Sequence, residues 1–183
     1  MVEHFRKVLE TAAKYEVSLV VHEPIKDTGL RRTFPNMMSR EGAKGQEFNG
    51  FMSSKDNNKP NHTTIIPFTR LLSSPMDYTP GIFNLVDYRY NSPEDRKINP
   101  NHRIPSTISK ELALYVVVYA PVQMAADLPI NYEGNPAFQF ILDVPTDWEE
   151  TKVLNGEIGE FITIARKDIN SDSWYIGSIR WTM

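Results

Sequence analysis

Three glutamates near the start of the chain offer side chains for acid–base or metal chemistry. Glu23 follows the apolar run of residues 17–21, and Glu41 and Glu47 lie in the loop that comes next. In barrels and open α/β sheets, polar residues at the carboxyl ends of strands form the ligand-binding edge. If the loop folds back over that edge, the three carboxylates converge.

Converging carboxylates point to a particular chemistry. Like charges repel, and the pKa of one carboxyl rises sharply unless a cation lies between them. Ca²⁺ is a hard cation that prefers oxygen ligands. Two carboxylates around one sugar are also the catalytic groups of glycoside hydrolysis. The alternative is that these glutamates are solvated surface groups, as most glutamates are.

Five neighbouring polar residues allow two interpretations each. His22, at the end of the strand, either hydrogen-bonds a substrate hydroxyl or is a half-buried side chain with local partners. Arg31 and Arg32 either pair with the carboxylates of the loop or lie in solvent. His62 and Asp77 are either site residues or helix caps and turn formers.

The composition describes a chain that can bury a core. Its 183 residues carry 20 basic and 23 acidic side chains, and the net charge of −3 gives no reason to expect nucleic acid or an anionic membrane as a partner. No stretch approaches the roughly 18 apolar residues of a membrane-spanning helix, and the first residues lack the apolar segment of a signal peptide. With no cysteine, the sequence excludes disulfides, thiolate zinc sites and cysteine nucleophiles.

A helix followed by a buried strand opens the chain. Apolar positions recur with helical spacing over residues 2–15, and residues 17–21 are short and rich in valine, as buried strands are. A helix that leads into such a strand is half of an α/β unit. Residues 24–61 predict a long irregular connection, which is usually functional when ordered. Residues 87–105 are polar and predict a surface excursion.

Two helices are predicted in the middle of the chain. Residues 61–73 predict a short buried helix. Residues 106–128 predict the longest helix, with Ser106 or Thr107 as its cap, apolar residues on nearly all sides and a kink at Pro121.

After Pro145 the sequence alternates with the period of two that strands show. Turns are predicted at the Asn-Gly pair of residues 155–156 and at residues 170–172. Three short strands without a partner layer are marginally stable, so we expect the chain to be a fragment cut at both ends. The predicted strands are residues 151–154, 160–166 and 173–179.

Four blocks of sequence resemble glycoside hydrolase family 97, a family of calcium-dependent α-glycosidases. The blocks follow one another in the family's order and at its spacing, and the similarity continues to about residue 179. One departure is Asp27, where the family usually has proline, and another is the stretch 180–182, which no longer looks like the family's strand. The four blocks are residues 21–36 (VHEPIKDTGLRRTFPN), 39–49 (SREGAKGQEFN), 62–70 (HTTIIPFTR) and 75–83 (PMDYTPGIF).

The resemblance implies a three-part enzyme with an N-terminal β-sandwich, a central (β/α)₈ TIM barrel and a C-terminal antiparallel β-sandwich domain. The expected fold class is therefore α/β. Residues 1–144 would be the C-terminal part of the barrel, and residues 145–183 would begin the C-terminal β domain. The N-terminal domain of the full-length enzyme and the early barrel strands would be missing.

The resemblance also assigns roles to the site residues. The glutamate matching Glu47 is the general acid, those matching Glu23, Glu41 and Glu47 bind Ca²⁺, and the residues matching His22 and Glu23 contact the substrate. A further calcium ligand would come from the N-terminal domain. The His-Glu pair at residues 22–23 resembles the inverting branch, in which this glutamate is the base for the attacking water. A second base glutamate would lie before Met1.

Together these features predict an exo-acting, inverting, calcium-dependent α-glucosidase that cleaves starch-derived oligosaccharides, of which this chain is an incomplete part and inactive alone. Two alternatives stay open. One is a non-catalytic, truncated fragment that binds calcium or carbohydrate, and the other is an α-galactosidase-type member of the same family. Family analogy places the whole enzyme in the periplasm or outside the cell.

Overall fold

The computed structural model describes residues 1–49, 58–86 and 104–181. The predicted surface excursion at residues 87–105 therefore lies almost wholly outside the described residues. Within the described ranges, none of the helices has the length and apolar character needed to cross a membrane.

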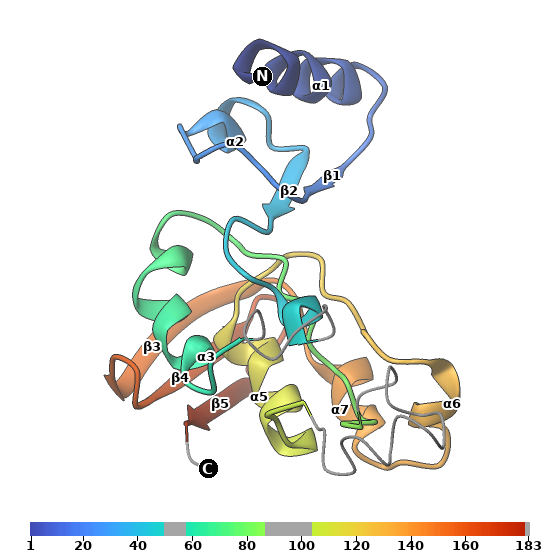
Figure 1. Ribbon diagram of the computed structural model, residues 1–183, viewed down its shortest axis with the longest axis vertical. Helices are drawn as coiled ribbons and strands as arrows, with labels where there is room; N and C mark the ends of the chain where they lie inside the picture. The colour runs from blue at the N-terminus through green and yellow to red at the C-terminus, as the bar shows by residue number, and fades with distance from the viewer. Residues whose placement is uncertain (50–57, 87–103, 182–183) are drawn as a thin grey trace, which may run out of the picture.

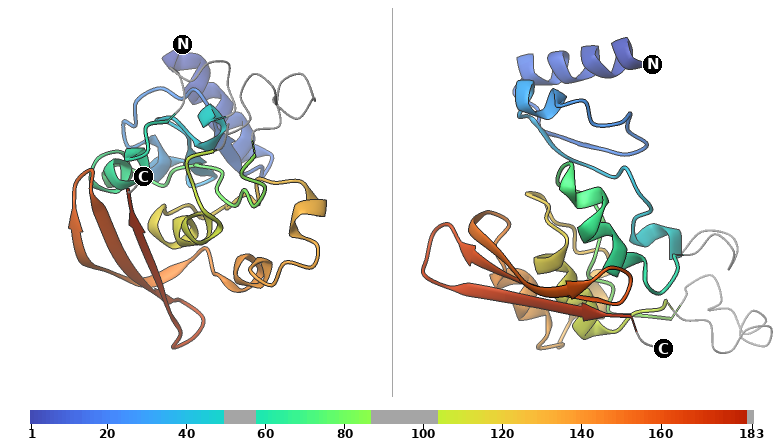
Figure 2. Two further views of the ribbon diagram at one scale, coloured as in Figure 1. Left: turned by 60° about the horizontal axis from the view of Figure 1, so that its bottom comes forward. Right: turned by 90° about the vertical axis from the view of Figure 1, so that its left-hand side faces the viewer.

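The N-terminal unit contains two helices and a pair of parallel strands. Helix α1 (Val2–Lys14) leads into strand β1 (Leu19–Val21), helix α2 (Leu30–Thr33) and strand β2 (Met37–Arg40). The first helix and strand are confirmed, whereas β2 lies in the segment predicted to be irregular. β1 and β2 pair in parallel, and Arg40 forms a further parallel bridge with Met76. Figures 1 and 2 show this unit standing apart from the rest of the molecule.

Short helical segments that belong to the body follow the N-terminal unit along the chain. They are η1 (Gln46–Asn49), α3 (His62–Ile65), η2 (Ile66–Phe68) and η3 (Arg70–Leu72). The buried helix predicted at residues 61–73 is thus present only as one turn of α-helix and two 3-10 turns. Pro67 contributes to the break, because it has no backbone N–H to continue the α-helical ladder.

Helix α5 (Ile108–Val117) is shorter than the helix predicted at residues 106–128. Thr107 is the N-cap, and its hydroxyl accepts a hydrogen bond from the backbone N–H of Lys110 at 3.1 Å. The helix ends at Val117, and its C-cap residue Val118 is extended. Pro121 cannot donate to the ladder and disfavours helical backbone at the residue before it, so the helix stops short of it rather than kinking there. Two short helices follow, α6 (Pro129–Tyr132) and α7 (Phe138–Asp143).

The C-terminal part is an antiparallel sheet in the order β3–β4–β5, as the alternation predicted. Its strands are β3 (Trp148–Glu157), β4 (Phe161–Asp168) and β5 (Trp174–Arg180). The turn predicted at residues 155–156 is wrong: β3 runs through these residues with a register shift, and the chain turns at Gly159, whose φ is +82°. β5 extends through Arg180, so the stretch that departs from the family pattern still begins within the strand.

The main hydrophobic core lies between α5 and this sheet. Gly177 of β5 allows the helix to approach closely, since a Cβ there would lie 2.7 Å from the carbonyl oxygen of Ala113 and 2.8 Å from the Cβ of Val116. The core combines side chains from both sides of residue 145, so the sheet and the segments before it stabilise each other. Its buried members are Ile66, Met76, Tyr78, Leu114, Val117, Val118, Ile162, Ile164 and Ile179.

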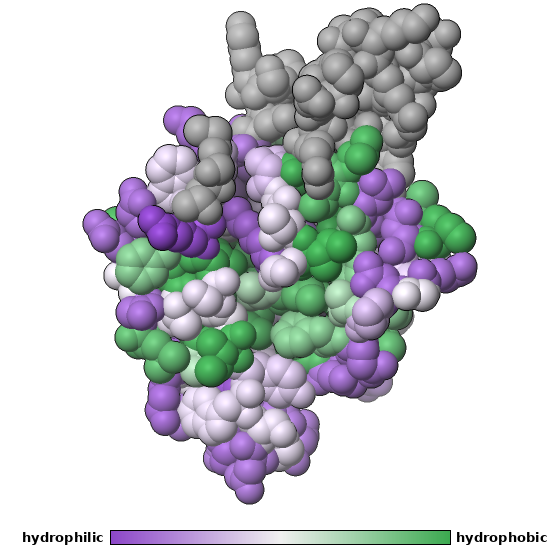
Figure 3. Space-filling view, turned by 90° about the horizontal axis from the view of Figure 1, so that it is seen from below, coloured by the Kyte–Doolittle hydropathy of each residue, from purple (hydrophilic) through white to green (hydrophobic). Residues whose placement is uncertain are grey.

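Hydrophobic side chains also remain at the surface. Seen from the end opposite α1, the molecule shows apolar side chains in the middle of its face (Figure 3). On the sheet, Val153 and Ile176 are 62% and 63% exposed. In α1 the only buried residue is Leu9.

Candidate active site

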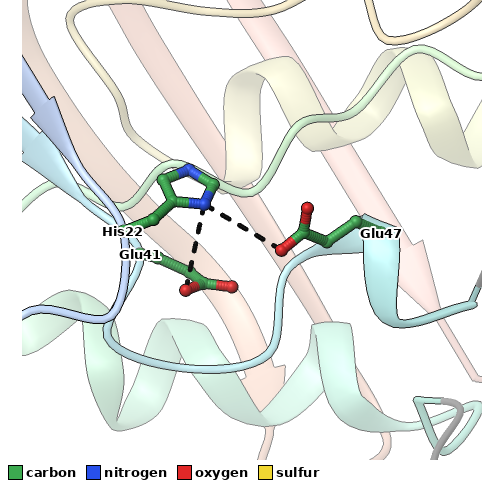
Figure 4. Close-up of side chains that lie close together, drawn as sticks. All are labelled: His22, Glu41 and Glu47. Atoms are coloured by element: carbon green, nitrogen blue, oxygen red, sulfur yellow. Dashed lines mark ion pairs between the residues drawn. The ribbon is translucent and has the colours of Figure 1, made fainter. Parts of the chain in front are cut away.

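Two of the three predicted glutamates meet beside a histidine where the N-terminal unit joins the body. The Nδ1 atom of His22 lies 4.0 Å from Oε2 of Glu41 and 3.9 Å from Oε1 of Glu47 (Figure 4). One ligand atom from each of the three side chains lies within 4.8 Å of the others. His22 directly follows β1, Glu41 directly follows β2 and Glu47 lies in η1, so the loop returns over the strand end as predicted and brings two of the three carboxylates there.

Asp77 fixes the orientation of His22. The Oδ2 atom of this buried carboxylate lies 2.6 Å from Nε2 of His22. A carboxylate only accepts hydrogen bonds, so Nε2 carries the proton and Nδ1 faces Glu41 and Glu47. The hydrogen bond to Asp77 and the charges of the three carboxylates raise the pKa of His22, against a smaller lowering by burial. Of the two interpretations given for Asp77, the structure supports a site residue.

Glu41 presents a buried oxygen without a protein partner. Its Oε2 accepts a long hydrogen bond of 3.4 Å from the backbone N–H of Glu23, while Oε1 is buried and has no hydrogen-bond partner. A buried carboxylate oxygen is costly to leave unsatisfied. A hard cation between Glu41 and Glu47 would satisfy it, and carboxylate oxygens are the ligands that Ca²⁺ prefers. The donor set therefore fits the expected metal.

The Glu47 carboxyl differs from that of Glu41 in exposure and in acidity. Its side chain is 39% exposed, against 9% for Glu41. Burial raises the pKa of Glu47 above its usual value, the neighbouring charge of Glu41 raises it further, and His22 lowers it. A carboxyl that is reachable from solvent and holds its proton more tightly than usual suits a general acid.

Glu23 joins the site through its backbone. Its N–H points to Glu41, its φ is +48°, and the residue is exposed. In the described part of the chain, the side chains close enough together to hold a metal ion are those of His22, Glu41 and Glu47, and the Glu23 carboxylate is not among them. Positive φ is unusual for a side chain other than glycine, and such residues cluster at functional sites.

Arg70 holds together the segments that carry the site residues. Its guanidinium donates to the carbonyl oxygens of Arg40 at 2.8 Å, Glu41 at 3.1 Å, Ser74 at 2.9 Å and Pro75 at 3.0 Å. Burial and the charge of Arg40 lower the pKa of Arg70 to about 10, so it is a cation at neutral pH. One side chain therefore ties the end of β2 to the segment that leads to Asp77.

Gly42 makes room for this arrangement. Its φ is +62°, and a Cβ at this position would lie 2.8 Å from both Nη1 of Arg40 and Nε of Arg70. Any other residue would displace a guanidinium beside Glu41. The sequence analysis assigned no role to Arg70 or Gly42, although both lie in blocks that resemble the family. The position of Gly42 directly after the candidate ligand Glu41 could have indicated its role.

Asp27 organises the turn after Glu23. Its Oδ1 accepts from the backbone N–H of Gly29 at 2.9 Å, and its Oδ2 accepts from Nε of Arg31 at 3.0 Å. The hydrogen bonds from Gly29 and Arg31 lower the pKa of Asp27, although its burial acts in the opposite direction. Arg31 is thus bound to Asp27 rather than to Glu41 or Glu47, and Arg32 is exposed.

His62 supports the loop from its other side. The ring atom Nε2 lies 2.8 Å from the carbonyl oxygen of Lys44, midway between Glu41 and Glu47 in the sequence. Burial lowers the pKa of His62, so a neutral ring with Nε2 protonated makes this bond. His62 contacts the loop, not the carboxylates.

Comparisons with known proteins agree on one class. Residues 1–43 match the family model described as glycoside hydrolase 97, and residues 147–182 match glycosyl-hydrolase 97 C-terminal, oligomerisation. Two curated relatives are a retaining α-galactosidase from Bacteroides thetaiotaomicron, 37% identical, and a probable retaining α-galactosidase from Streptomyces bingchenggensis, 30% identical. Both alignments cover 94% of this chain but 25% and 24% of the relatives, so the chain spans about a quarter of their length.

Solved structures give the same result. A glycoside hydrolase family 97 enzyme from Pseudoalteromonas sp. strain K8 matches in its complexes with panose and with acarbose, at 48% and 49% identity. Each match has a TM-score of 0.81 and covers 94% of this chain and 26% of that enzyme. A β-arabinopyranosidase shares the fold at 22% identity, with a TM-score of 0.81 over 96% of this chain and 27% of the other.

The two family matches, the curated relatives and the solved structures thus agree on glycoside hydrolases as the class of protein. Within that class, the chain belongs to glycoside hydrolase family 97, as the four sequence blocks indicated. The second family match runs through residue 182, so the departure noted at residues 180–182 does not end the similarity.

Replacing Arg70 by lysine tests whether its hydrogen bonds hold the site together. Lysine keeps the charge but cannot reach four carbonyl groups in a planar fork. We expect Arg70→Lys to lower the free energy of unfolding by about 1–3 kcal/mol, because buried acceptors lose their donors. Thermal unfolding with Arg32→Lys as the exposed control, expected within about 0.5 kcal/mol of the parent, measures the effect. Equal stability of the two variants would contradict this role for Arg70.

Proposed function

We propose that this chain supplies the general acid and part of the calcium site of an exo-acting, inverting α-glucosidase that cleaves starch-derived oligosaccharides. The observation that carries the proposal is the pairing of Glu47, whose pKa is raised, with the buried, unpartnered oxygen of Glu41. This is the arrangement expected of an acid held beside a cation site. Family membership and the sugar-bound structures of a relative at 48–49% identity support it.

Each residue of the site takes one role in this proposal. Glu47 protonates the leaving glycosidic oxygen, and Glu41 holds Ca²⁺ with its buried carboxylate. Glu23, exposed at the rim, is the base for water and a further calcium ligand once its side chain turns inward. His22 contacts the sugar through Nδ1, because Asp77 occupies Nε2.

The calcium ion would orient the substrate and neutralise the carboxylates around it. A dication favours the charged form of a carboxyl, whereas a general acid must keep its proton. The two requirements are compatible if Glu23 and Glu41 are the main ligands and Glu47 contacts the ion through one oxygen or indirectly. The difference in burial between Glu41 and Glu47 supports that division.

The specific sugar and the stereochemistry are the finer parts of the proposal. The His-Glu pair at residues 22–23 and the greater identity to an enzyme solved with panose, an α-linked glucose trisaccharide, favour an inverting α-glucosidase. The names of the two curated relatives favour a second candidate, a retaining α-galactosidase. Inversion needs room for a water between acid and base, whereas retention needs a carboxylate nucleophile close to the sugar.

We further infer that residues 1–144 form the later part of a (β/α)₈ barrel and that residues 145–183 open the C-terminal β domain. The parallel order β1–β2 followed by the bridge from Arg40 to Met76 is what successive barrel strands produce. The site lies at the carboxyl ends of these segments, as in barrel enzymes. By family analogy the whole enzyme acts in the periplasm or outside the cell.

Removing the acid should affect substrates according to their leaving groups. We expect Glu47→Gln to reduce kcat/KM by about 10²–10⁴-fold on oligosaccharides, whose leaving groups need a proton. Activated aryl glycosides, whose leaving groups do not, should lose far less. Steady-state kinetics of the full-length enzyme measure both, with Glu133→Gln, an exposed glutamate after α6, as the matched control. Equal losses on both substrates would remove Glu47 from the acid role.

The anomer released first separates the two candidate activities. An inverting α-glucosidase releases β-glucose from an α-glucoside, which ¹H NMR detects before mutarotation. We expect the full-length enzyme to release this product from p-nitrophenyl α-glucoside, with little turnover of p-nitrophenyl α-galactoside. Initial release of the α-anomer, or a preference for the galactoside, would favour the retaining α-galactosidase instead.

A further inference from the structure

A carboxylate without a role in the proposed reaction lies buried beside the loop that carries Glu47. Glu111, in the first turn of α5, has an exposed fraction of 0%. Burying a charge is costly unless hydrogen bonds replace its hydration. The partners of Glu111 therefore show what this carboxylate holds in place.

Four donors from three separate segments bind Glu111. Its Oε1 accepts from Nε2 of Gln46 at 2.9 Å and from the hydroxyl of Ser106 in a short hydrogen bond. Its Oε2 accepts from the backbone N–H groups of Gly81 at 2.9 Å and Ile82 at 3.3 Å. Burial raises the pKa of Glu111, and these hydrogen bonds oppose that rise. Because all four partners donate, the arrangement suits a carboxylate, which accepts only.

Gln46 connects this buried carboxylate to the active site. It directly precedes Glu47 at the start of η1 and is 2% exposed. Its side chain donates to Glu111, and its backbone N–H donates to the carbonyl oxygen of Tyr78 at 2.8 Å. Tyr78 in turn follows Asp77, which orients His22. Gln46 is thus fixed at two points, and one of them depends on Glu111.

We propose that Glu111 is a positioning residue for the general acid: by holding Gln46, it sets the place of the Glu47 backbone and hence the reach of the Glu47 carboxyl toward the glycosidic oxygen. The inference rests on the acid role proposed for Glu47. The contacts of Glu111 with residues 81 and 82 bind the segment after Asp77 to the same carboxylate. Glu111 therefore fixes the acid and the orienting pair of His22 and Asp77 relative to each other.

Two substitutions in the full-length enzyme test this role. Glu111→Gln replaces one acceptor oxygen by an NH2 group that faces donors, and Gln46→Met removes the side-chain amide that donates to Glu111 through Nε2. We expect both to lower kcat on oligosaccharides about 10- to 100-fold, as misplacement of a catalytic group by about 1 Å does. KM and turnover of activated aryl glycosides should change by less than about threefold. The double variant should be no slower than the slower single variant, since both substitutions break the same hydrogen bond between Gln46 and Glu111.

Thr107→Ala is the matched control. It removes the side-chain cap of the same helix and leaves the side chains that bind Glu111 in place. We expect it to lower the midpoint of thermal unfolding. The ratio of kcat on oligosaccharides to kcat on activated aryl glycosides should stay unchanged. If Glu111→Gln and Gln46→Met behave like this control, or slow both substrates equally, Glu111 is structural only and the proposal is wrong.

The outcome can be told apart from a failure of the proposed function. If the proposed acid role of Glu47 were wrong, the loss of kcat/KM in Glu47→Gln itself would not depend on the leaving group of the substrate. If Glu111→Gln does not fold, Gln46→Met decides the matter alone, because it leaves the other three donors of Glu111 in place.

Discussion

Repulsion between carboxylates in a small space is the constraint on which the site depends. Glu41 is almost buried and Glu47 lies near it, with His22 between them and Asp77 behind. The histidine gives partial compensation, but one oxygen of Glu41 remains buried without a partner. A cation at this point would relieve the repulsion and satisfy that oxygen. The rest of the local structure serves to hold these groups in place despite their mutual repulsion.

A half-buried cation and a buried anion provide that support. Arg70 grips the carbonyl groups of the chain around Glu41, and Glu111 grips donors around Gln46 and Gly81. A cation thus holds backbone acceptors and an anion holds donors, so neither depends on a flexible surface ion pair. Because α5, which carries Glu111, also packs on the C-terminal sheet, that sheet stabilises the site although no site residue identified here lies in it.

The sequence predicted the parts of the structure with a clear period and missed those fixed by tertiary contacts. The apolar stripe of residues 2–15 and the alternation after residue 145 identified α1 and the sheet. Strand β2 was missed because four residues are too few to show a period. Residues 118–128 are mostly apolar but irregular, since hydrophobicity alone does not distinguish a helix from irregular chain. Glu111 went unnoticed because a glutamate in the first turn of a helix ordinarily faces solvent.

The central claim is that Glu41 and Glu47 share one calcium ion, and a crystal structure of the full-length enzyme grown with Ca²⁺ tests it most directly. The account predicts an ion between these carboxylates, with oxygen ligands at about 2.3–2.6 Å, one of them Oε1 of Glu41. It further predicts that the ion is lost in Glu41→Gln. A structure in which Ca²⁺ is absent from this point, and Oε1 of Glu41 bonds to another protein group, would contradict the account.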